Sequence, residues 1–301
     1  IDENYVVYAE NGEDGLFRLK LFCVNPAVNL GEYLKKGRSA VFFSATLLPM
    51  SYYRKLLSNR QDDYGIYVES PFSQKNRCIL NAGDVSSLYS RRGYEEYHKI
   101  AEYIARTVWQ HKGNYMVFFP SYKMLEEVYA VYEEEFSVNW VKCICQNSSM
   151  KEQEREEFLQ EFEQNQESLV AFCIMGGIFS EGIDLLGEKL IGAILVGTGL
   201  PQLGNEREIL RSFYTENGEN GFDYAYRYPG MNKVLQAAGR VIRTREDHGV
   251  ILLLDERFRQ REYSNLFPVE WNDRKTCTLS NVEAQLQKFW ESIPDKISCK
   301  L

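Results

Sequence analysis

Apolar runs of strand length alternate with helical segments along most of this chain of 301 residues. The runs are almost uninterrupted in their hydrophobicity, as in YMVFF at 115–119 and GVILLL at 249–254. Strands that are apolar on both sides are typical of a parallel sheet with helices on both faces. Helices are expected around these strands at residues 93–111, 123–135, 150–164, 206–215, 231–243 and 281–290. The pattern predicts an α/β fold built on a mostly parallel sheet.

A different pattern occupies the first fifty residues. The segments YVVYA and LFRLKLFCV, separated by the turn-rich ENGEDG, predict a small β-hairpin. A short helix is expected over residues 28–36, and AVFFSATLLPM, which starts at Ala40, predicts an apolar strand that ends in small polar residues. We therefore expect a hairpin segment over residues 1–50 and the main domain over residues 51–301.

Net charge, cysteine usage and the lack of a targeting segment limit the classes of protein to which this chain can belong. The formal net charge is −8, so the chain lacks the overall basic character of many nucleic-acid-binding domains. Seven irregularly spaced cysteines and three histidines form no zinc-ligand pattern, and we expect reduced, buried thiols in a cytoplasmic protein. No signal peptide or membrane-spanning run is visible, and no membrane partner is expected. The first residues, IDENYVVYAE, suggest the interior of a longer protein.

Four polar or glycine-rich stretches directly follow predicted strands. Ligand sites of parallel sheets form at the carboxyl ends of the strands, so these stretches should lie along one edge. In one of them, GGIFSEGID, Gly182 would allow a ligand to approach the backbone, while Glu181 and Asp184 supply acceptors that suit a ribose hydroxyl. The alternative is a glycine-rich turn with solvated acids. The other three stretches are SAT, PSY and GTGLPQ.

The stretch QAAGRVIRTREDHG, residues 236–249, concentrates arginine. Arg240 and Arg243 are three residues apart, which would place them on one face of the predicted helix. Gln236 lies one turn upstream, and the small residues between would let the helix pack closely. Guanidinium groups match phosphate geometry, so the stretch predicts an arginine finger. The alternative is a basic helix end that is stabilised by the helix dipole.

Four motifs in sequence order resemble motifs III to VI of superfamily-two helicases of the DinG/XPD type. They are SATLLP, VFFPSY, FSEGIDL and QAAGRVIR, and the resemblance extends over roughly residues 39–271. One place departs from the XPD pattern, which usually has an arginine and a lysine around the glycine before SEGID. This chain has IMGGIF there, which is more similar to bacterial DinG-like proteins.

The resemblance implies the second RecA-like domain, the C-terminal motor half, of an ATP-dependent 5′–3′ DNA helicase. ATP and magnesium would be held mainly by the N-terminal motor domain of the same protein, because this chain has no GxxxxGK[ST] phosphate loop. The isolated chain should therefore be inactive. An iron–sulfur cluster is possible only in that other half.

The resemblance also assigns roles to residues of this chain. Gln236, Arg240 and Arg243 would face the triphosphate, and Asp184, with Glu181 and Gly182, would face the ribose. Single-stranded DNA would contact Ser121 and Tyr122.

Two other functions stay open at this point: a degenerate RecA-like interaction domain without ATPase activity, and an RNA-directed motor of the same superfamily. The acidic strand end at Asp255 imitates a metal-binding motif, but no phosphate loop accompanies it. We interpret it as structural.

Overall fold

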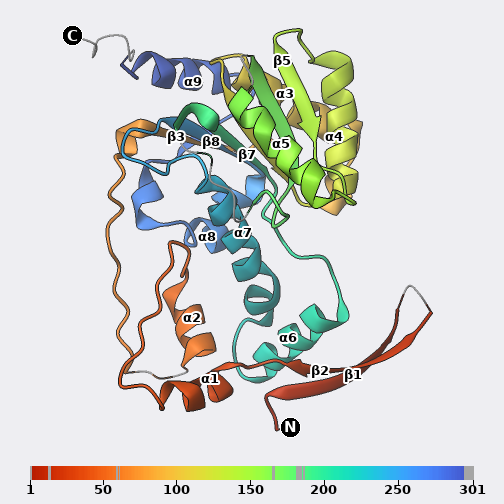
Figure 1. The fold of residues 1–301 in the computed structure, drawn as a ribbon, viewed down its shortest axis with the longest axis vertical. Helices are drawn as coiled ribbons and strands as arrows, with labels where there is room; N and C mark the ends of the chain where they lie inside the picture. The colour runs from red at the N-terminus through yellow and green to blue at the C-terminus, as the bar shows by residue number, and fades with distance from the viewer. Residues whose placement is uncertain are drawn as a thin grey trace. The chain divides into compact units, whose positions relative to one another are not determined.

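The computed structural model describes residues 2–12, 15–58, 60, 62–164, 167–180, 185 and 187–294 (Figure 1). The chain forms two compact units. The larger comprises residues 69–200 and 230–301, and the smaller comprises residues 1–68 and 201–229. The predicted α/β fold is confirmed, since a seven-stranded sheet forms the larger unit and a two-stranded hairpin stands at the start of the smaller one.

The large sheet is parallel throughout its described ladders, with strand order β5-β6-β4-β7-β8-β3-β9. In register, Val117 of β4 lies opposite Phe172 of β6 and Ile194 of β7. Every residue of β3, β4, β7 and β8 is buried, which explains their uninterrupted hydrophobicity. The strands are β3 (Arg77–Ala82), β4 (Asn114–Phe119), β5 (Val141–Cys145), β6 (Ser168–Ile174), β7 (Gly192–Val196), β8 (Gly249–Leu254) and β9 (Lys275–Cys277).

One face of this sheet packs on α3 (Tyr94–Val108), α4 (Tyr122–Glu135) and α9 (Val282–Glu291), which share one hydrophobic core with it. Helix α3 buries Ile100, Ile104 and Val108 at the spacing of one helix face. Alternate strand residues such as Met116 and Phe118 are also buried, but on the opposite face. The larger unit also contains the α-helices α5 (Glu152–Gln164), the short α8 (Arg261–Ser264) and α7 (Tyr228–Ala238), of which residues 230–238 belong to this unit.

The smaller unit begins with the predicted hairpin. Strand β1 (Tyr5–Asn11) pairs antiparallel with β2 (Phe17–Cys23). Helices α1 (Ala27–Leu34), α2 (Met50–Leu57) and α6 (Asn205–Glu216) follow, with a π-helical turn at Asp223–Arg227. Tyrosines form its aromatic core: the ring of Tyr52 lies 5.1 Å from that of Tyr224 and 5.0 Å from that of Tyr228.

Two expectations for secondary structure were wrong. The predicted strand AVFFSATLLPM pairs with no other strand in the described part of the chain, and Val41 and Phe43 are 82% and 88% exposed. An apolar run becomes a strand only where a neighbour satisfies its backbone hydrogen bonds. The helix predicted at 231–243 ends at Ala238.

Among the described residues, no helix combines the length and apolar character needed to cross a bilayer.

Candidate functional site

Three of the four predicted stretches lie at the carboxyl edge of the large sheet. Pro120–Tyr122 follows β4, residues 175–180 follow β6, and Gly197–Leu200 follows β7. Ser121 caps α4, because its hydroxyl accepts a hydrogen bond from the Met124 backbone N–H at 3.4 Å. The fourth stretch, SAT, belongs to the smaller unit and follows no strand in the described chain.

Gln146 joins these loops, although it was not predicted as a site residue. It follows β5 and is 5% exposed. Its Oε1 accepts from the backbone N–H of Ile174 at 2.9 Å, and its Nε2 donates to the hydroxyl of Tyr122 at 3.0 Å. The Tyr122 hydroxyl in turn donates to the carbonyl of Asn147 at 3.3 Å. A polar residue directly after the apolar strand VKCIC was the available signal.

Close backbone contact places the start of α7 at the same edge. A Cβ atom on Gly199, which has φ +67°, would lie 2.5 Å from the carbonyl oxygen of Gly230 in α7. A side chain at residue 199 would therefore force the loop after β7 away from the helix. Only glycine satisfies both the backbone angle and the space at this position.

The arginine stretch lies beyond the end of α7. The N–H of Gly239 still donates to Leu235 at 2.9 Å, but the next two donate over three residues, as in Arg240 to Ala237 at 3.3 Å. Arg240 and Arg243 therefore lie in the turn that leads into β8, and the expectation that they share one helix face is wrong. Gln236 is half-buried in the last turn of α7, and both arginines are half-buried.

Asp247 holds the turn that follows the helix. Its carboxylate accepts hydrogen bonds from the backbone N–H groups of Arg243 and Thr244, both at 2.7 Å, and from the Thr244 hydroxyl at 2.7 Å. These N–H groups are thus withdrawn from helical pairing. Burial acts to raise the pKa of Asp247, but the hydrogen bonds from Thr244 and Arg243 outweigh it and leave the pKa below its ordinary value.

One hydrogen bond brings the arginine turn to the loop after β6. The Nε of Arg240 donates to the carbonyl oxygen of Ser180 at 3.2 Å. Ser180 is fully buried, and its hydroxyl donates to the carbonyl of Gly177 at 2.8 Å. The structure thus joins two of the predicted site stretches. The predicted ribose-facing residues Glu181, Gly182 and Asp184 come directly after Ser180 and lie outside the described residues.

The acidic end of β8 is occupied by internal contacts. Asp255 is fully buried and accepts from Ser87 Oγ at 2.6 Å and from Arg257 Nε at 2.8 Å. Burial acts to raise the pKa of Asp255, but the hydrogen bonds and charge of Arg257 hold it below its ordinary value. The interpretation of this acid as structural agrees with these contacts. Within the described residues, no group of three histidine, cysteine or acidic side chains could hold a metal ion.

Comparisons with known proteins agree with this arrangement. The family described as Helicase C-terminal domain matches residues 104–274. The chain is 28% identical, over 91% of its length, to a homolog of regulator of telomere elongation helicase 1 from Aedes aegypti, and 26% identical to that from Culex quinquefasciatus. It is 25% identical, over 86% of its length, to a probable ATP-dependent helicase of Methanocaldococcus jannaschii.

The chain spans 30% of the length of the two insect relatives and 40% of the archaeal one. Among solved structures, an XPD helicase is similar over 91% of this chain and 48% of its own, with a TM-score of 0.67 and 18% identity. That likeness supports the RecA-like fold, and the motif order agrees with it. The chain belongs to the helicase C-terminal domain family, and the predicted resemblance to XPD/DinG-type superfamily-two helicases is confirmed.

Proposed function

We propose that this chain is the C-terminal motor half of an ATP-dependent DNA helicase and that its arginine turn completes the nucleotide site. The observation that carries the proposal is the hydrogen bond from Arg240 to Ser180. It joins the arginine turn to the stretch whose glycine and acids are expected to meet the ribose. A site for a nucleotide needs both kinds of group within one small region.

The donors of this chain suit a triphosphate. Gln236 offers an amide, and Arg240 and Arg243 offer guanidinium groups whose charge is fixed over the working pH range. Negative charge spreads over the phosphate oxygens in the transition state of phosphoryl transfer, and arginines lower its energy. Asp247 would contribute indirectly, because it fixes the backbone of Arg243.

The remaining parts of the site would come from elsewhere in the full-length protein. The phosphate loop is absent from this chain, so we propose that the first motor domain supplies it and the acid that holds magnesium. Magnesium would neutralise charge on the phosphates when bound. On this proposal the isolated chain turns over ATP negligibly, and an iron–sulfur cluster, if the protein has one, belongs to the first domain.

Single-stranded DNA would run along the carboxyl edge of the large sheet. Ser121 and Tyr122 lie there, and the Tyr122 hydroxyl is held by Gln146 and Asn147. A tyrosine fixed in this way offers a ring on which a base can stack. The 5′–3′ direction of movement is proposed from the family resemblance.

The test is ATP turnover by the full-length protein without nucleic acid, with single-stranded DNA and with single-stranded RNA of the same sequence. We expect turnover that DNA stimulates more than RNA. Stimulation by RNA alone would favour an RNA-directed motor. A full-length protein that binds partners but never hydrolyses ATP would favour a degenerate interaction domain and contradict the proposal.

A further inference from the structure

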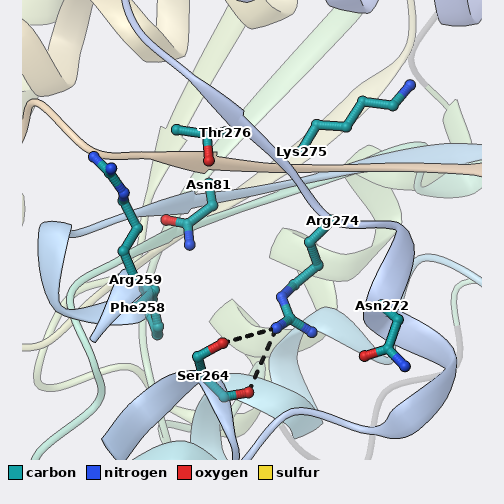
Figure 2. Close-up of a pocket in the computed structure, with 8 residues that line it drawn as sticks. All are labelled: Asn81, Phe258, Arg259, Ser264, Asn272, Arg274, Lys275 and Thr276. Carbon is teal, nitrogen blue, oxygen red and sulfur yellow. Dashed lines mark hydrogen bonds between the residues drawn. The ribbon is translucent and has the colours of Figure 1, made fainter. Parts of the chain in front are cut away.

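A polar pocket of about 280 Å³ lies beside β3 and β9 in the larger unit (Figure 2). None of the residues assigned above to nucleotide or DNA lines it. Three of its side chains are cationic and two carry hydroxyl groups. The polar residues that line the pocket include Asn81, Arg259, Ser264, Arg274, Lys275 and Thr276.

The pocket concentrates positive charge without an acid in its lining. Within the described residues, Arg259, Arg274 and Lys275 form no ion pair, whereas Arg257 is paired with Asp255. The charge of Asp273 acts on Arg274, but its carboxylate lies 3.5 Å from the guanidinium of Arg77. The lining residues therefore carry a net positive charge, and that charge would attract an anion.

Neutral groups hold Arg274 in place. Its Nη1 donates to the carbonyl of Trp271 at 2.8 Å, its Nη2 donates to the hydroxyl of Ser264 at 3.2 Å, and its guanidinium lies 4.3 Å from the centre of the Phe267 ring. Burial lowers the pKa of Arg274 by more than the nearby charge of Asp273 raises it. Its position is thus fixed before any ligand arrives.

Two further features indicate a built site. Asn81 is 6% exposed, and its Oδ1 is buried without a hydrogen-bond partner among the described residues. In Figure 2 the side-chain amide of Asn81 points into the space between Arg259 and Arg274. Arg259 itself lies directly over Gly83, where a Cβ atom would collide with its guanidinium. Oδ1 is a hydrogen-bond acceptor, so its burial costs free energy unless a ligand offers it a donor, as the hydroxyl of a protonated phosphate does.

We propose that this pocket binds a phosphate group. Guanidinium forks and hydroxyl donors match the tetrahedral oxygens of phosphate. The group could belong to a free phosphate compound or to a phosphodiester of a nucleic-acid strand. Both offer anionic oxygens to the arginines, and only the protonated free phosphate also offers a hydroxyl to Asn81.

Calorimetric titration of the full-length protein with inorganic phosphate tests the proposal, with sodium chloride of equal ionic strength as reference. The double substitution Arg259→Gln and Lys275→Gln removes two cations from exposed positions. We expect it to weaken the phosphate site about tenfold or more, since each charge-assisted hydrogen bond contributes substantially to affinity. Arg261→Gln, an exposed arginine of the neighbouring α8 that does not line the pocket, is the matched control and should bind like wild type.

A second titration separates the two sources of phosphate. A single-stranded oligonucleotide without terminal phosphates displaces inorganic phosphate from the pocket if the ligand is a strand, and leaves it bound if the ligand is a free phosphate compound. Equal phosphate affinity in wild type and double variant, or no binding beyond chloride, would overturn the proposal. Should the double variant melt below wild type, Lys275→Glu alone provides the same comparison. The phosphate titration is independent of helicase activity, so its failure leaves the proposed function standing.

Discussion

The Nε of Arg240 donates a hydrogen bond to the backbone carbonyl of Ser180 at 3.2 Å. The contact connects the turn after α7 with the loop after β6, and each carries one of the predicted nucleotide-facing stretches. Because the acceptor is a backbone atom, any residue at position 180 could receive this bond. The contact therefore constrains the path of the loop more than the identity of its side chain.

Arg243→Ala in the full-length protein should abolish most ATP turnover. An arginine that stabilises charge formed in the transition state affects kcat more than nucleotide affinity. Comparable arginines contribute about 10³–10⁵-fold in rate. Steady-state ATPase assays at saturating single strand, with nucleotide binding measured in parallel, provide the values. Arg243→Lys should rescue little, because an ammonium lacks the planar fork.

The control for this prediction is Arg245→Ala. Arg245 is exposed in the same turn, and its backbone carbonyl, which the substitution keeps, accepts from Asn76 at 2.8 Å. Its variant should turn over ATP like wild type. Equal mild losses for residues 240, 243 and 245 would mean that the turn is merely basic and has no catalytic arginine.

Asp247→Asn should destabilise the protein by about 1–3 kcal/mol, because a carboxylate that accepts three hydrogen bonds becomes an amide that cannot match them. The folded pKa of Asp247 is lowered, so its contribution is present above the ordinary carboxyl pKa and is lost as the pH falls through the folded value. Urea unfolding of wild type and variant at pH 7 gives the difference in unfolding free energy. The same measurement at lower pH shows whether that difference shrinks as Asp247 is protonated. The neighbouring exposed Glu246→Gln should unfold like wild type, and an equal loss there would contradict a specific role for Asp247.

Gln146→Ala should separate the loops after β4 and β6. The substitution removes the acceptor of the Ile174 N–H and one of the two hydrogen bonds of the Tyr122 hydroxyl, so we expect a loss of about 1–3 kcal/mol in unfolding free energy. Binding of fluorescent single-stranded DNA to the full-length protein should weaken as well. Tyr122→Phe keeps the ring and removes only the hydroxyl, so it should retain more of the binding. Unchanged DNA affinity in Gln146→Ala would show that the network serves stability alone.

His111 should make stability depend on pH near neutrality. Its ring stacks on Trp290 of α9 at 4.0 Å between centres, and burial lowers its pKa. The unfolded chain then binds a proton more readily than the folded one. The contribution of His111 to the free energy of unfolding is fully present above the ordinary histidine pKa of about 6.5. It is lost as the pH drops toward the lower pKa of the folded protein. Thermal unfolding between pH 8 and 5 should show a smaller decline for His111→Phe than for wild type, and identical declines would contradict this assignment.

The sequence by itself determined the fold class and the family. Uninterrupted apolar runs such as GVILLL fit only strands that are covered on both sides, and the order of four short motifs identified the type of helicase domain. The tertiary structure decided what depends on partners distant in sequence. Helix α7 ends at Ala238, and Asp247 then holds the turn beyond it through the N–H groups of Arg243 and Thr244. Gln146 bonds to Ile174 and Tyr122, which are distant from it in the sequence. The stretch AVFFSATLLPM, residues 40–50, was predicted as a strand, but an apolar run cannot form a ladder without a neighbouring strand to receive its hydrogen bonds.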